Sequence, residues 1–391
     1  MIDFNNTEVA FKIKNNISLR KAQILFKSIN NPSIARMLNG LTAIALKGRL
    51  PVSWLVKPTL YAQFVGGESL EECNGTGEQL WKFGVSSILD YSVEGKDSEE
   101  AIEACFKEVL RGIEFAATKD HVAFTVFKPT GIAHADILEK ISSGVPLTSN
   151  DNAAYSQFVE RVNELCRRAA ELNVPILIDA EDFCYQKAID DVVELMMERY
   201  NRQRAIVYNT LQMYRTDRLD YLHKLYSVAS EKGFTVGAKF VRGAYMEKER
   251  ERASERGYPS PINESKAATD EMYDNALIFS VEHLDRISIF AGTHNEDSVK
   301  LLVELVYKYS LSPNDQRIWF SQLYGMSDNL TFNLAAEGFN VAKYVPYGPV
   351  TEVLPYLIRR ASENTSVAGQ SSRELNLINQ EIKRRKSYKQ W

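Results

Sequence analysis

The sequence predicts an α/β fold, a distorted (βα)8 TIM-like barrel preceded by an N-terminal helical region. After residue 80, eight short β-rich runs follow one another, and most are continuously apolar, as parallel strands covered by helices are. Segments with apolar residues at i, i+3 and i+4 lie between these runs. A doubly wound open sheet is the alternative, although no Gly-x-Gly-x-x-Gly motif follows a strand and no P-loop is present.

The predicted elements divide the chain into three parts. Residues 1–80 are expected to be helical and irregular, with apolar stretches at Met37–Leu50 and Trp54–Val65. The barrel is predicted for residues 81–370, and a basic tail for residues 371–391. The predicted strands are Phe83–Tyr91, His121–Lys128, Val174–Asp179, Ala205–Gln212, Val236–Arg242, Ile287–Thr293, Ile318–Leu323 and Asn340–Val345. Helical spacing is clear in Asp190–Tyr200 and Ala267–His283.

The composition argues against several classes of function. The 391 residues carry a net charge of −4, which is unlike the basic character that nucleic-acid binding requires. The four cysteines and five histidines show no zinc or redox spacing, so we expect reduced thiols and no metal site. The first residues lack the features of a signal or transit peptide, so we expect none, and no apolar run approaches roughly 18 residues. These features favour a bacterial cytoplasmic location.

Polar residues end most of the predicted strands. In parallel barrels the active site lies at the C-terminal ends of the strands, so these side chains are the candidate site. They are Lys128, Asp179, Gln212, Lys239, Arg242, Tyr245, Thr293, His294, Gln322 and Tyr344. Taken singly, each has a structural explanation, such as a solvated lysine, a loop-closing Gln212 or a helix-capping His294. Their joint placement favours a large polar or anionic ligand, such as a phosphate-bearing cofactor.

A turn at Gly348 and Pro349 is predicted to start a helix that carries a second group of candidate residues. Tyr356, Arg359, Arg360 and Glu363 lie at helical offsets of three, four and seven, so they share one face. Adjacent guanidinium groups form a fork that binds a carboxylate through paired hydrogen bonds. This pattern predicts a lid over a small carboxylate, and the alternative is a solvated helix face with an incidental arginine pair.

Three carboxylates follow the third predicted strand, at Asp179, Glu181 and Asp182. They fit either an acid/base pair or a strand-end partner for Lys128 next to a helix N-terminus. The second interpretation is favoured, because a lysine beside a buried cofactor needs a counter-charge.

These residues resemble those of the proline dehydrogenase family, and in particular its monofunctional, FAD-dependent members of the mitochondrial type. The resemblance runs from about residue 83 to about residue 366. It is strongest in Ile178–Glu181, Lys239–Tyr245, Thr293–Asn295, Gln322–Met326 and Tyr344–Asn364. It implies a distorted (βα)8 barrel with FAD across the strand ends. The implied reaction, the first step of proline catabolism, passes a hydride from proline C5 to flavin N5, gives Δ1-pyrroline-5-carboxylate, and sends the electrons to a quinone.

The resemblance also implies a role for each matching residue. Arg359, Arg360 and Lys128 are expected to bind the proline carboxylate, and Tyr344, Tyr356, Tyr245 and Leu323 to surround its ring. Lys239 stands where the family usually has Arg, near flavin N5. Asp179 is expected to orient Lys128. Lys239 and Asp179 are therefore the catalytic candidates. The implied FAD contacts are Gln212, Lys239, Val241, Arg242, Gly243, Thr293, His294, Gln322 and Glu363.

Other interpretations of the same residues stay open. One is a hydroxyproline dehydrogenase, although that branch of the family typically carries Ser where this chain has Tyr344. Another is a barrel lyase or aldolase that uses Lys128 or Lys239 as a Schiff-base amine. A third is a scaffold without enzymatic activity. The basic tail is either a solvated terminal helix or a peripheral contact with anionic lipid at the inner membrane.

Replacing Arg359 or Arg360 by Met is expected to raise the KM for L-proline by about ten- to a hundredfold. Each change removes a charge-assisted hydrogen bond worth roughly 1.5–3 kcal/mol. Steady-state kinetics with L-proline measure the effect. An unchanged KM in both variants would remove the two arginines from the substrate site.

Overall fold

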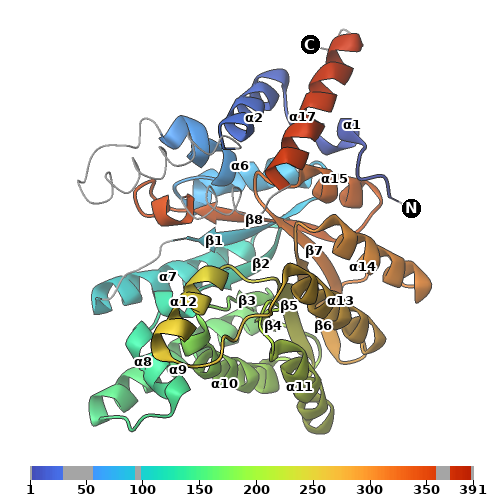
Figure 1. The fold of residues 1–391 in the computed structure, drawn as a ribbon. Helices are drawn as coiled ribbons and strands as arrows, with labels where there is room; N and C mark the ends of the chain where they lie inside the picture. The colour runs from blue at the N-terminus through green and yellow to red at the C-terminus, as the bar shows by residue number, and fades with distance from the viewer. Residues whose placement is uncertain (1, 30–55, 93–97, 358–369, 389–391) are drawn as a thin grey trace. The chain divides into compact units, whose positions relative to one another are not determined.

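Eight parallel strands form a closed barrel in the computed structural model, in the order β1 to β8 (Figure 1). The structure describes residues 2–29, 56–92, 98–357 and 370–388. The closed barrel confirms the predicted fold class and excludes the open doubly wound sheet. The chain divides into two compact units, Gly95–Ser321 on the one hand and Met1–Glu94 with Gln322–Trp391 on the other.

The unit formed by Gly95–Ser321 contains most of the barrel. Its strands are β2 (Val122–Phe127), β3 (Ile176–Ile178), β4 (Val207–Gln212), β5 (Val236–Val241), β6 (Ile287–Gly292) and the greater part of β7 (Ile318–Leu323). Its helices are α7 (Glu99–Ala116), α8 (Ala135–Ser143), α9 (Ser149–Glu171), α10 (Phe183–Tyr200), α11 (Arg218–Lys232), α12 (Met246–Arg256), α13 (Lys266–Glu282) and α14 (Glu296–Lys308). Each strand lies inside the run that the apolar pattern predicts.

Local signals in the sequence set the ends of these helices. Thr148 and the third residue of α9, Asp151, form a reciprocal capping box. Ser265 caps α13 by accepting a hydrogen bond from the backbone N–H of Ala268. Helix α11 ends at Gly233, which adopts the left-handed conformation that glycine tolerates best.

Aromatic side chains fill the interior of this part of the barrel. The ring of Phe124 packs edge-on against Tyr208, Phe290 and Trp319, with ring centroids 5.5, 5.0 and 5.2 Å apart. Gly237 lies beside this group, and a Cβ there would stand 2.8 Å from the ring of Tyr208.

The second unit contains β1 (Ser86–Tyr91) and β8 (Val341–Tyr347), which pair in parallel. Its helices are α1 (Thr7–Ala10), α2 (Asn16–Ile29), the π-helical turn η1 (Lys57–Tyr61), α5 (Ala62–Phe64), α6 (Leu70–Trp81), α15 (Asp328–Ala336) and α17 (Gln370–Ser387). The described part of the predicted stretch Trp54–Val65 is helical from residue 56 to residue 64. The stretch Met37–Leu50 lies outside the described residues.

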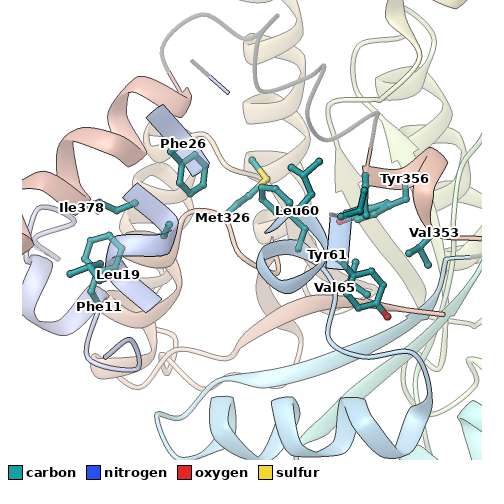
Figure 2. Close-up of a cluster of buried hydrophobic side chains, with 14 of the residues drawn as sticks. Phe11, Leu19, Phe26, Leu60, Tyr61, Val65, Met326, Val353, Tyr356 and Ile378 are labelled. Carbon is teal, nitrogen blue, oxygen red and sulfur yellow. The ribbon is translucent and has the colours of Figure 1, made fainter. Parts of the chain in front are cut away.

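A hydrophobic cluster joins the two ends of the chain in this unit. Figure 2 shows Phe11, Leu19 and Phe26 near Ile378 of α17, and Tyr61 and Met326 further along the same cluster. The buried side chains of α17 are Glu374, Leu377, Ile378, Glu381, Ile382 and Arg385. The tail is therefore not a solvated terminal helix, because its apolar face is part of this core.

Four charged side chains lie in contact beside that cluster. Lys343 of β8 is 1% exposed, and its Nζ lies 3.0 Å from Oδ1 of Asp328, the first residue of α15. Lys14 Nζ lies 3.3 Å from Oδ2 of the same carboxylate. Glu374 of α17 accepts a hydrogen bond of 3.1 Å from the backbone N–H of Ser327. Burial raises the pKa of Glu374 to about 7, and the charge of Asp328 adds to this effect.

Replacing Lys343 by Met is expected to lower the free energy of unfolding by about 3–5 kcal/mol, because the variant leaves a buried carboxylate without its nearest counter-charge. Urea denaturation measures the change. The matched control is Lys300→Met, which removes a partly exposed ion pair with Glu296 and should cost less than about 1 kcal/mol. Equal losses in both variants would contradict the importance of the buried pair.

Candidate functional site

An ion pair connects the ends of β3 and β5. Lys239 Nζ lies 2.5 Å from Oδ1 of Asp179, and the lysine is only 5% exposed. Strand β4 lies between them, with Asn209 in register with Ile178 and Thr210 in register with Lys239. The Thr210 hydroxyl donates a hydrogen bond of 2.7 Å to the carbonyl of Ile178. The parallel registers thus bring the two predicted catalytic residues together, and the counter-charge that Asp179 supplies goes to Lys239.

A second carboxylate after β3 fixes the loop that carries Lys128. Glu181 is buried and accepts a hydrogen bond of 2.8 Å from the backbone N–H of Thr130 and another from the Thr130 hydroxyl. Burial raises the pKa of Glu181 to about 7, although Thr130 and the charge of Lys128 act in the opposite direction. Through Thr130, Glu181 therefore holds the loop that carries Lys128, and the expected role of a carboxylate after β3 as the counter-charge of Lys128 itself stays a prediction.

Asp182 and Gln212 complete this group. Asp182 occupies the position before α10, yet its side chain forms an ion pair with Lys248 of α12 instead of capping the helix. Gln212 ends β4 and is 3% exposed. Its amide donates a hydrogen bond of 2.7 Å to the backbone carbonyl of Glu181. Gln212 thus ties the end of β4 to the loop after β3.

Arg242 and Thr293 meet at the ends of β5 and β6. The guanidinium of Arg242 donates hydrogen bonds of 2.6 Å to Asp270, 2.8 Å to the Thr293 hydroxyl and 3.0 Å to the Ser298 hydroxyl. It also lies over the ring of Tyr273, 4.5 Å from the centroid. The structure therefore brings two predicted cofactor residues into direct contact and fixes the orientation of the guanidinium.

The turn after β5 exposes backbone next to these residues. Gly243 adopts φ = 123°, and a Cβ there would stand 2.6 Å from the ring of Tyr214, so only glycine fits. Val241 and Tyr245 are half-buried on either side of it. His294 is also half-buried, but the capping residue of α14 is the neighbouring Asn295, which accepts from the backbone N–H groups of Asp297 and Ser298.

The other unit holds a second group of candidate residues around β8. The backbone N–H of Tyr324 donates to the carbonyl of Tyr344, and the Thr331 hydroxyl donates to the side chain of Gln322 over 2.7 Å. Leu323 packs against the buried cluster. Figure 2 shows Tyr356 in the same cluster. The structure thus sets Gln322, Leu323, Tyr344 and Tyr356 in a common unit.

The helix expected after Pro349 begins later than predicted. The carbonyl of Pro349 accepts from the backbone N–H groups of Glu352 and Val353, which closes a turn, and helix starts at residue 354. Tyr61 anchors the turn, since its hydroxyl donates a hydrogen bond of 2.9 Å to the carbonyl of Gly348. Tyr356 lies on this helical segment, whereas Arg359, Arg360 and Glu363 lie outside the described residues.

Sequence reasoning missed two positions that hold these loops. Glu181 was considered only as part of a carboxylate run, and the signal for its role was the hydroxyl at Thr130 in the preceding loop. Lys343 was hidden inside an apolar strand. It donates hydrogen bonds to the carbonyls of Leu323 and Met326 and thereby holds the turn after β7. A lysine in the middle of an otherwise apolar strand was the available signal.

The described residues contain neither a candidate metal site nor a candidate membrane-spanning helix. No group of three or more His, Cys, Asp or Glu side chains is placed to hold a metal ion within those ranges. None of the helices there has the length and apolar character needed to cross a membrane.

Comparison with known proteins identifies the family. The family model described as "Proline dehydrogenase" matches residues 73–373. The chain belongs to the proline dehydrogenase family. The match confirms the family membership expected from the sequence and, with it, the assignment to a family of oxidoreductases.

Named proteins from several organisms are similar in sequence to this chain. Proline dehydrogenase 2, mitochondrial, of Arabidopsis thaliana is 32% identical over 374 residues, which cover 85% of this chain and 79% of that protein. Proline dehydrogenase 1, mitochondrial, of Dictyostelium discoideum is 33% identical, with 86% of this chain and 66% of that protein covered. The carbapenem antibiotics biosynthesis protein CarD of Pectobacterium carotovorum is 36% identical, with 82% and 83% covered.

Solved structures agree on the fold. Proline utilization A from Bdellovibrio bacteriovorus matches 92% of this chain with a TM-score of 0.72 at 20% sequence identity. A Bradyrhizobium japonicum proline utilization A mutant matches 79% of this chain with a TM-score of 0.65. The chain spans only 38% and 31% of these two proteins. At this identity the likeness supports the barrel fold alone.

Replacing Glu181 by Gln is expected to change how stability depends on pH. The pKa of Glu181 rises from 4.5 to about 7 on folding, so the native state binds the extra proton and is favoured at low pH. This contribution is fully present below about pH 4.5 and is lost as the pH rises to about 7, by about 3 kcal/mol at most.

Urea denaturation of both proteins between pH 4.5 and 7.5, a window taken from these pKa values, gives the difference between their free energies of unfolding. That difference should shift in favour of the Gln variant as the pH rises. A difference that stays constant over the whole range would contradict the assignment.

Proposed function

We propose that this chain oxidises L-proline to Δ1-pyrroline-5-carboxylate, with FAD as cofactor and a quinone as the final electron acceptor. The observation that carries the proposal is the buried ion pair between Lys239 and Asp179 at the strand ends, in a chain of the proline dehydrogenase family. In this proposal FAD, when bound, supplies the hydride acceptor at its N5 atom.

The residues at the strand ends fit an anionic dinucleotide. Arg242 is oriented by three hydrogen bonds, so a phosphate would meet a charge that is already positioned. Gly243 presents backbone without a side chain, which allows a large group to approach closely. In the proposal Gln212, Val241, Thr293, His294 and Gln322 complete the set, together with Glu363 beyond the described residues.

Lys239 has a specific part in this proposal. It stands near the reacting end of the cofactor and offers a single compact charge in place of the planar fork of Arg. Asp179 holds that ammonium over 2.5 Å and so fixes the atom that faces the cofactor. The two residues thereby keep a positive charge in place as electrons arrive.

Substrate binding in the proposal relies on charge and shape. Lys128, Arg359 and Arg360 bind the carboxylate of proline, and Tyr344, with Leu323, Tyr245 and Tyr356, encloses the ring and excludes water. The carboxylate of Glu181 holds the Lys128 loop through Thr130, so that the first cation arrives in a fixed position. No side chain is required as a strong base if proline binds as the neutral amine.

The experiment that tests the proposal compares L-proline with 4-hydroxyproline in a dye-reduction assay, together with detection of Δ1-pyrroline-5-carboxylate. Tyr344 is only 8% exposed, so an added hydroxyl would be crowded. We expect kcat/KM to favour L-proline by about a hundredfold. The variant Tyr344→Ser should narrow that ratio, whereas the control Tyr307→Ser, at an exposed position of α14, should leave it unchanged.

Two results would count against the proposal. Comparable kcat/KM values for both substrates would indicate a hydroxyproline dehydrogenase. A protein without flavin that forms a borohydride-trapped adduct with a carbonyl substrate would indicate a Schiff-base enzyme. Lys239 argues against the last outcome, because it is committed to an ion pair with Asp179 while a Schiff-base lysine reacts as the neutral amine.

A further inference from the structure

Helices α2 and α17 lie side by side in the unit that contains both chain ends (Figure 1). Two contacts fix their relative direction. Arg385 Nη1 donates a hydrogen bond of 2.9 Å to Asn16 Oδ1, and Gln23 Nε2 donates one of 2.6 Å to Asn379 Oδ1. The start of α2 thus meets the end of α17, so the helices are antiparallel and share one outer surface.

The exposed charges of this helix pair are all positive. Helix α2 contains no acidic residue, and the two acidic residues of α17, Glu374 and Glu381, are buried. The exposed charged side chains of the pair are Arg20, Lys21, Lys27, Arg373, Lys383 and Lys386. The whole chain has a net charge of −4, so this concentration of cations is a local feature.

Two large apolar side chains stand among these cations. Ile17 and Ile24 are 70% and 65% exposed, and they lie seven residues apart, two turns along the same side of α2. That side is opposite to the buried face formed by Leu19, Ala22 and Phe26. Helix α2 therefore has a second apolar stripe that the described residues do not cover.

A cation-lined hollow adjoins the same helices. It has a volume of about 450 Å³ and is lined by Glu8, Val9, Lys12, Lys14, Arg384 and Arg385. Arg385 is fixed by hydrogen bonds to the backbone carbonyls of Phe11 and Lys14, and Arg384 by ion pairs with Glu8 and Glu381. Four cations and one carboxylate thus line the hollow, and backbone carbonyls hold one of the cations, Arg385.

We infer that the α2–α17 surface, consisting of the exposed side chains of both helices and the hollow beside them, docks onto an anionic phospholipid bilayer. Lipid phosphate groups meet the lysines and arginines, while Ile17 and Ile24 enter the boundary between headgroups and acyl chains. Isolated isoleucines between flexible basic side chains fit a fluid lipid surface better than a shaped protein partner, which would require a contiguous apolar patch. The inference does not rest on the proposed oxidation of proline.

The test is flotation of the full chain with vesicles of phosphatidylcholine alone and of phosphatidylcholine with phosphatidylglycerol. We expect binding only to the anionic vesicles, and weaker binding as salt is added. The variant Lys21→Gln/Lys27→Gln should lose about 25-fold in affinity, at about fivefold for each charge. The variant Ile17→Ser/Ile24→Ser should lose at least about tenfold while its melting temperature stays unchanged.

Matched controls keep the test specific. Lys107→Gln/Lys187→Gln removes two exposed cations of the unit Gly95–Ser321, which does not contain α2 or α17. Val145→Ser/Tyr307→Ser removes two exposed apolar groups of the same unit. Both variants should bind vesicles like the wild type. Dye-linked turnover of the isoleucine variant should equal that of the wild type, so a failure of the proposed enzyme activity would show separately.

Four results would overturn the inference. The first is equal binding to neutral and anionic vesicles. The second is a lower melting temperature of the isoleucine variant, because it would mean that the chain itself covers Ile17 and Ile24. The third is a concentration-dependent dimer that the isoleucine variant abolishes. The fourth is release from vesicles by inorganic phosphate at constant ionic strength, which would assign the hollow to a free anion.

Discussion

A charge that leaves water must be paired, and this constraint organises both units of the chain. Lys239 on β5 is buried against Asp179, and Lys343 on β8 is buried against Asp328. The first pair connects β5 to the residue after β3, and the second connects β8 to the first residue of α15. The first fixes a cation at the strand ends of one unit, and the second fixes the turn that carries Leu323 in the other.

The consequence for chemistry is preorganisation. Asp179 holds Lys239, Glu181 holds the Lys128 loop through Thr130, and Asp270 holds Arg242, so three cations at strand ends already have defined positions. An enzyme that transfers a hydride needs geometry more than it needs a strong acid or base. In a family of proline dehydrogenases, this arrangement supports a role in orienting a flavin and an amino-acid carboxylate.

The sequence predicted the barrel well because its signal is local. Buried parallel strands are continuous apolar runs, so each observed strand falls close to its predicted range, and the polar residues Lys239, Asp179, Arg242 and Thr293 were expected together at the strand ends. The same reasoning failed for segments whose burial depends on contacts with distant parts of the chain. Helix α17 was treated as a solvated tail because its basic residues dominate its composition, while its buried residues are few and are recognised only beside α2 and Phe11.

The ion-pair partners of buried charged side chains also could not be predicted from the local sequence. The pairing of Asp179 with Lys239 over 2.5 Å depends on strand register, which no single apolar run reveals, whereas the expected role of Asp179 in orienting Lys128 stays a prediction. Lys343 was overlooked because a lysine inside an apolar strand gives no indication of which neighbouring element supplies its carboxylate. Such pairings depend on topology and are therefore the part of the site that needs the structure.

The most direct measurement is the absorbance spectrum of the purified protein, recorded without oxygen before and after addition of excess L-proline. Strand-end cations that hold a flavin against proline predict a bound FAD whose oxidised absorption bands disappear on mixing. A protein that takes up no FAD, or a bound flavin that remains oxidised in the presence of L-proline, would contradict the account.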